Sequence, residues 1–111
     1  MDNKKIFIVN LSKGKIGEDK ANLLGSLLVS SIQTEAMSRS FIEEEKITDF
    51  FFYIDEFQNF GIEKFTSILS EARKYRLSLI IAHQYLSQIN PKIKNAILGN
   101  VGNIIFFYSV R

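Results

Sequence analysis

The feature of this sequence that most constrains its fold is a set of four short, almost unbroken apolar runs. They span residues 6–11 (IFIVNL), 50–54 (FFFYI), 77–82 (LSLIIA) and 104–108 (IIFFY). Polar and apolar residues do not alternate regularly within them, so each run predicts a strand that is buried on both faces. Strands of this kind are typical of a parallel sheet with helices packed on both sides.

Three segments with helical patterns lie between these runs. Residues 18–39 begin with two acids, which the helix dipole favours in a first turn. Residues 62–75 carry one apolar stripe, and residues 91–98 begin with Pro91 and are followed by Gly99. The expected apolar positions of the first two helices are Leu24, Leu27, Leu28, Ile32, Ile62, Phe65, Ile68, Leu69 and Ala72.

The predicted elements therefore alternate, strand then helix, from the first run to the last. Right-handed crossovers between parallel strands then give an α/β fold, a mostly parallel sheet with helices on both faces. No linker or internal repeat divides the 111 residues. Residues 1–111 are expected to form one compact domain, or part of a larger one.

Composition excludes several classes of protein. The chain has no cysteine and a single histidine, His83, which excludes a disulfide scaffold and a zinc site built from cysteines. Its longest uncharged stretch, residues 95–110, is shorter than the roughly 18 residues that cross a membrane. No apolar leader opens the sequence, so a cytoplasmic protein is expected. The net charge of +2 is by itself too small to indicate nucleic-acid binding.

The clearest chemical pattern is FFFYIDEFQ, in which two acids follow an apolar strand. This is the Walker B pattern of ATPases. Asp55 at the strand end can hold Mg²⁺ beside nucleotide phosphates, and Glu56 can polarise the attacking water. Two acids that merely cap a loop would give the same pattern. The phosphate-binding loop G-x-x-x-x-G-K-S/T is missing, so the chain is either part of an ATPase or not one.

Polar residues also follow two of the other predicted strands. Ligands of parallel α/β sheets bind at the carboxyl ends of the strands. Lys13 and Lys15 lie in the SKGKIG loop after the first strand, and His83 and Gln84 follow the third. We interpret His83 as a structural residue at a strand end. The loop lysines are candidates for contacts with DNA or phosphate.

The order of five segments resembles one family. IFIVNLSKGKIGED, LLGSLLVSSIQTEAMSR, FFFYIDEFQNF, FTSILSEARKYRLSLIIAHQYLSQI and ILGNVGNIIFF follow one another as in the C-terminal part of the HerA–FtsK motor domain. Within these ATPases, the chain is most similar to the conjugative coupling proteins of type IV secretion. The resemblance extends over residues 6–108.

The resemblance implies a role for each matching residue. Asp55 would hold Mg²⁺ as the Walker B aspartate, and Glu56 would be the catalytic glutamate. Gln84 would sense the γ-phosphate of ATP. Arg73, in SEARKY, would reach the γ-phosphate of the neighbouring subunit. The resemblance does not settle the role of Lys13 and Lys15.

The family also implies a fold and partners. The fold would be a partial RecA-like P-loop core that lacks the Walker A strand, loop and helix, so this chain alone should not hydrolyse ATP. The parent would be a DNA-translocating hexamer that uses ATP and Mg²⁺, contacts secretion-channel proteins and is tethered to the inner membrane. This chain itself is expected to contain no membrane segment.

Two other functions stay open on the sequence alone. The first is a non-catalytic interaction domain that keeps the fold and binds a partner. The second is a metal-dependent phosphoesterase that uses Asp55, Glu56 and His83, although these three residues supply few ligands for a two-metal site.

Overall fold

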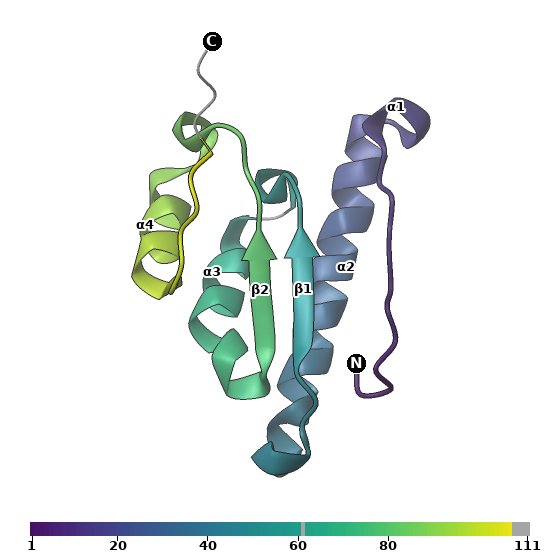
Figure 1. The fold of residues 1–111 in the computed structure, drawn as a ribbon. Helices are drawn as coiled ribbons and strands as arrows, with labels where there is room; N and C mark the ends of the chain where they lie inside the picture. Colours follow the sequence, from purple (N-terminus) through teal and green to yellow (C-terminus); the bar gives the residue numbers. More distant parts are fainter. Residues whose placement is uncertain (61, 108–111) are drawn as a thin grey trace.

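The computed structural model describes residues 1–60 and 62–107, and Figure 1 shows their arrangement. The elements, in chain order, are α1 (Lys13–Ile16), α2 (Glu18–Ser38), 3₁₀ turns at Arg39–Phe41 and Glu44–Lys46, β1 (Phe50–Ile54), a 3₁₀ turn at Phe57–Asn59, α3 (Ile62–Glu71), a 3₁₀ turn at Ala72–Tyr75, β2 (Leu77–Ile81), a 3₁₀ turn at Leu86–Gln88 and α4 (Pro91–Asn100). In the part of the chain that is described, no helix is long and apolar enough to cross a membrane.

The centre of the molecule is a parallel pair of strands. β1 pairs with β2 in a register that runs from Phe50 opposite Leu77 to Ile54 opposite Ile81. The apolar runs at 50–54 and 77–82 therefore form strands as predicted, with Ala82 falling just outside β2. α2 and α3 pass behind the two strands and cover one face of the sheet (Figure 1).

The other two predicted strands do not form within the described residues. The N-terminal segment, residues 6–11, is extended but has no ladder partner, and Ile6 is 90% exposed. The C-terminal segment, residues 101–107, is likewise unpaired, and Tyr108 lies outside the described residues. In Figure 1 the first segment runs beside α2 and the second beside α4. An apolar run becomes a strand only when it pairs with the edge of a sheet. Neither segment lies along the edge of β1 or of β2.

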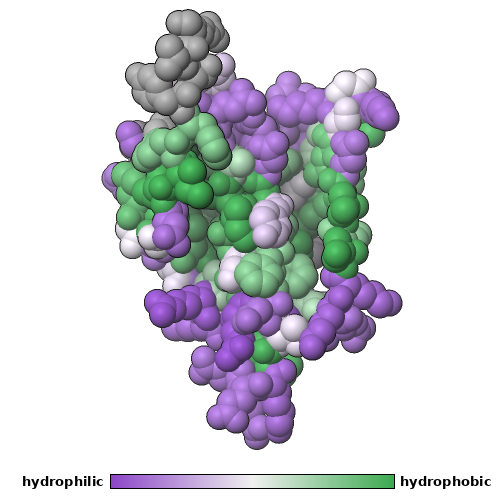
Figure 2. Space-filling model, viewed as in Figure 1, coloured by the Kyte–Doolittle hydropathy of each residue, from purple (hydrophilic) through white to green (hydrophobic). Residues whose placement is uncertain are grey.

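The prediction that both sheet faces are buried is wrong for the described residues. Exposure alternates along β1, where Phe50 and Phe52 pack towards the helices but Phe51 and Tyr53 are 59% and 71% exposed. No described helix covers this second face. We call it the open sheet face, and its residues are Phe51, Tyr53, Ser78 and Ile80. Figure 2 shows apolar groups across the middle of this side, between polar ends.

The core lies between the sheet and its helices. α3 contributes Phe65 and Ile68, and the 3₁₀ turn that follows it contributes Ala72, as the predicted stripe requires, whereas the side chain of Ile62 is not described. On α2 the predicted stripe is correct only in part, because Ile32 packs against the core and Leu28 is half-buried. Leu24 and Leu27 are exposed, and the buried positions are Ala21, Gly25, Val29 and Ala36.

Small residues explain the shifted face of α2. A Cβ atom placed on Gly25 would lie 2.2 Å from the ring of Phe60, so only glycine permits this approach. The helix therefore packs closely against the chain that follows β1. Leu24 and Leu27 lie on the solvent side of α2 instead.

The end of α4 also differs from the prediction. Pro91 occupies the first turn, and the Asn90 side chain caps the helix by accepting a hydrogen bond from the Lys92 N–H at 2.9 Å. The helix continues through Gly99 to Asn100, so Gly99 does not end it.

Candidate functional site

The carboxyl ends of β1 and β2 meet at one edge of the sheet, where the chain turns away from each strand. Asp55 directly follows β1 and is exposed, and its Oδ1 accepts a hydrogen bond from the Glu56 N–H at 2.9 Å. Glu56 has a φ of +50°, in the left-handed region that residues other than glycine rarely adopt. This local bond helps to turn the backbone sharply after the strand, so the two acids diverge.

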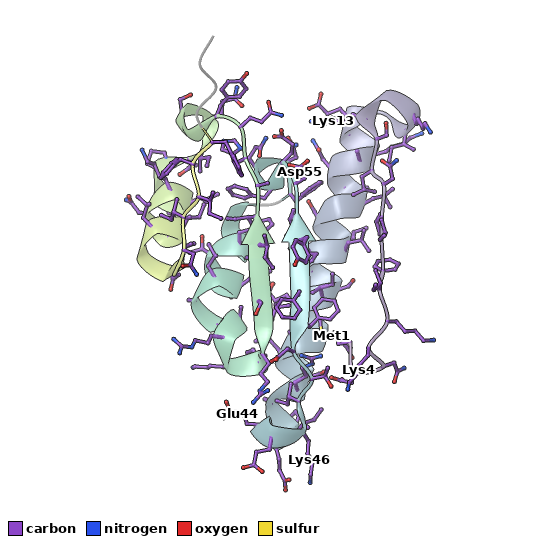
Figure 3. The ribbon with its side chains drawn as sticks, in the orientation of Figure 1. Met1, Lys4, Lys13, Glu44, Lys46 and Asp55 are labelled. Carbon is purple, nitrogen blue, oxygen red and sulfur yellow. The ribbon has the colours of Figure 1, made fainter. Side chains whose placement is uncertain are left out.

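Lys13 is brought to the same edge by the N-terminal part of the chain. Its Nζ donates to Glu18 Oε1 at 3.1 Å and to Asn59 Oδ1 at 3.3 Å. Figure 3 shows Lys13 and Asp55 at one end of the molecule, with Glu44 and Lys46 at the other. The predicted SKGKIG loop is in fact the short helix α1. Lys15 is exposed on it and makes no ion pair in the described residues.

Gln58 links the ends of the two strands. Its Nε2 donates to Glu56 Oε2, and its Oε1 lies 2.8 Å from His83 Nδ1. His83 also contacts the Tyr85 carbonyl through Nε2, and its ring meets the edge of the buried Phe57 ring with centroids 5.5 Å apart. His83 is therefore a half-buried structural residue, as interpreted, but one that is bonded to the turn after β1.

Two of the predicted site residues stand apart from this cluster. Gln84 is exposed and makes no hydrogen bond among the described residues. Arg73 is exposed in the 3₁₀ turn that leads into β2, at the amino end of that strand. Asp55 and Glu56 follow the carboxyl end of β1, so Arg73 does not reach them within one chain.

The edge offers hydrogen-bonding groups rather than a preformed metal centre. In residues 1–60 and 62–107, no three His, Asp or Glu side chains lie close enough together to hold a metal ion. Asp55 and Glu56 each have a carboxylate oxygen without a partner among the described residues, since only Asp55 Oδ1 and Glu56 Oε2 are bonded. One such oxygen fits a Mg²⁺ ion whose other ligands are water and phosphate, but it does not fit a two-metal phosphoesterase site.

Sequence reasoning missed the partners that hold the cluster together. Glu18 and Asn59 bind Lys13, and Gln58 joins Glu56 to His83. These polar residues lie at helix starts and in turns, where no periodic pattern marks them. The only available signal was that Gln58 and Asn59 follow the Asp55–Glu56 pair closely, with Phe57 between them.

The second notable feature of the surface is its exposed aromatic and aliphatic side chains. Phe106 and Phe107 are 73% and 93% exposed on the C-terminal segment, and Phe51 and Tyr53 stand on the open sheet face. Exposed apolar groups that gather on one part of a surface mark sites of protein interaction.

Residues 49–110 match a family model described as the TraM recognition site of TraD and TraG. The match spans more than half of the 111 residues. The chain belongs to this family. Searches of curated proteins and of solved structures find no match to it.

Membership of the TraM recognition family links the chain to the conjugative coupling proteins TraD and TraG. The matched range begins just before β1 and includes α3, β2, α4 and the C-terminal segment. Asp55, Glu56, Arg73 and Gln84 lie inside it, whereas Lys13 and Lys15 lie outside. The open sheet face and the exposed Phe106 and Phe107 are also inside.

Proposed function

We propose that this chain is the protein-recognition part of a conjugative coupling protein and that it binds a TraM-type protein on the cytoplasmic side. The observation that carries the proposal is the family match, and exposed aromatic side chains within the matched range support it. The TraM recognition family matches residues 49–110, and this range carries Phe51, Tyr53, Phe106 and Phe107 with most of each side chain exposed.

The exposed aromatic residues are well suited to binding a protein partner. Aromatic side chains supply most of the energy at many protein interfaces, because each one buries a large area at a small cost in conformational entropy. The open sheet face presents Phe51 and Tyr53 side by side with Ser78 and Ile80 of the neighbouring strand. The C-terminal segment adds four consecutive apolar residues, numbered 104–107.

Replacing Phe107 tests the proposal. We expect Phe107→Ser to weaken binding of a TraM protein from the same conjugative system by about 30-fold, since a hot-spot aromatic is worth about 2 kcal/mol. Phe41→Ser is the matched control, because Phe41 is 94% exposed but lies outside the matched residues. Calorimetric titration measures both affinities. Equal affinities for the two variants would contradict the proposal.

A second candidate function is that the chain supplies the Walker B strand of a DNA-translocating ATPase of the HerA–FtsK type. The observation that favours it is the position of Asp55 and Glu56 directly after a parallel strand, with one Asp55 oxygen free. Asp55 would hold Mg²⁺, which neutralises phosphate charge when bound. Glu56 would orient water, Gln84 would contact the γ-phosphate, and Arg73 would act on a neighbouring subunit of a hexamer.

An ATP hydrolysis assay tests this second candidate. The assay uses a polypeptide that joins this chain to a phosphate-binding loop. We expect Glu56→Gln to lower turnover by about 100-fold or more and to leave nucleotide binding intact, because general-base catalysis contributes about that factor. Glu71→Gln, on α3, is the control. Turnover of Glu56→Gln at the wild-type rate would exclude the role of Glu56.

A further inference from the structure

Gln58 is held by two neighbours that make opposite demands on its side-chain amide. A carboxylate only accepts hydrogen bonds, so Glu56 takes the NH₂ end of the amide. The oxygen end then faces His83, where Oε1 lies 2.8 Å from Nδ1. Glu56 thereby fixes which end of the Gln58 amide His83 meets.

His83 is in turn placed between two acceptors. Its Nδ1 faces Gln58 Oε1, and its Nε2 faces the carbonyl oxygen of Tyr85. A doubly protonated ring donates to both oxygens at once, whereas a neutral ring carries one hydrogen and donates to only one of them. The His83 ring also forms a T-shaped contact with the ring of Phe57, which is 2% exposed, and this contact limits movement of the imidazole away from the two oxygens.

The contacts join parts of the chain that are distant in sequence. Gln58 lies in the 3₁₀ turn after β1, and His83 lies 25 residues later, just beyond β2. Tyr85 immediately precedes the 3₁₀ turn at Leu86–Gln88, which leads to α4. A change at Glu56 can therefore reach the connection between β2 and α4 through two side chains.

We propose that Glu56, Gln58 and His83 form a conformational relay in which Glu56 decides which nitrogen of the neutral His83 ring carries the hydrogen. While Glu56 binds the Gln58 NH₂ group, the Gln58 oxygen faces Nδ1 and the Tyr85 carbonyl faces Nε2, and the relay requires the single hydrogen to stay on Nδ1. When Glu56 turns away towards a ligand, the Gln58 amide rotates and donates to Nδ1. The hydrogen then moves to Nε2, where it binds the Tyr85 carbonyl and tightens the loop before α4. Gln58 is thus a positioning residue, and the relay goes beyond the proposed recognition function.

Nitrogen-15 NMR of the ring tests the relay in the 111-residue chain. His83 is the only histidine, so its two ring nitrogens give one assignable pair of signals. Spectra are recorded at about pH 9, well above the ordinary titration range of histidine. We expect the hydrogen on Nδ1 in the wild type and on Nε2 in Glu56→Ala. The exposed Gln84, replaced in Gln84→Ala, is the control and should leave the hydrogen on Nδ1.

A double variant separates the relay from a purely structural role. In Glu56→Ala with Gln58→Glu, a carboxylate oxygen faces Nδ1 without help from residue 56, so the hydrogen should return to Nδ1. A structural disturbance caused by losing Glu56 would not be reversed in this way. The proposal is overturned if Glu56→Ala keeps the hydrogen on Nδ1, if the wild type already carries it on Nε2, or if the double variant resembles Glu56→Ala.

Discussion

Arg39→Ala is expected to lower the free energy of unfolding by about 2–4 kcal/mol, because two backbone carbonyls lose charge-assisted hydrogen bonds inside the protein. Arg39 is 1% exposed at the end of α2. Its guanidinium donates to the carbonyls of Thr48 and Tyr75, each at 3.1 Å, and to Asp2 Oδ1 at 2.8 Å. The side chain thus ties the N-terminus to the residues that lead into both strands.

The alanine variant loses these bonds and leaves a cavity. The two carbonyls would lose charge-assisted partners inside the protein, while the half-exposed Asp2 carboxylate can be rehydrated. Arg76→Ala is the matched control, since Arg76 pairs with Asp49 at 3.4 Å on the surface and its loss should cost less than about 1 kcal/mol. Urea denaturation measures both. Similar losses in the two variants would show that Arg39 is not the link described.

Phe65→Ala is expected to have the other large effect, a loss of about 3–5 kcal/mol, because it empties a tightly packed core position. Phe65 is 1% exposed on α3 and meets Phe57 edge-to-face with ring centroids 5.7 Å apart. Phe57 in turn supports His83. The variant should therefore destabilise the protein and also broaden the His83 ring signals.

Two control variants separate burial from aromatic character. Phe65→Leu keeps most of the volume and should cost less than about 1.5 kcal/mol. Phe41→Ala removes a ring that is 94% exposed, so its free energy of unfolding should change by less than about 0.5 kcal/mol. Thermal or urea unfolding compares the three. A loss in Phe41→Ala as large as that in Phe65→Ala would contradict the assigned core.

The local pattern of apolar residues correctly predicted those helices and strands that pack against one another. The apolar runs of β1 and β2 and the stripe of α3 were predictable because each buries its apolar side against the others. The runs at 6–11 and 104–107 are equally apolar but lie beside α2 and α4 rather than along the edges of the β1–β2 pair, and composition alone does not reveal where a segment packs. The face of α2 was predicted only in part, because small residues such as Gly25 and Ala36 form much of its packed side and large apolar residues do not mark it.

The candidate site was predictable only in part, for a related reason. The positions of Asp55 and Glu56 could be predicted from the apolar run before them, because the residues after a strand lie at the edge of the sheet where that strand ends. The link from Gln58 to His83 joins residues 25 positions apart, and only the pairing of β1 with β2 brings them together. The burial of Arg39 likewise depends on tertiary structure.

The most direct test of TraM recognition is a calorimetric titration of a TraM protein from the same conjugative system into the 111-residue chain. We expect saturable binding with a negative heat-capacity change, the mark of apolar surface buried on association. The same titration with Phe106→Ser and Phe107→Ser combined should show little or no heat of binding. A wild-type chain that gives no heat and no saturation at any accessible concentration, while correctly folded, would contradict the proposed function.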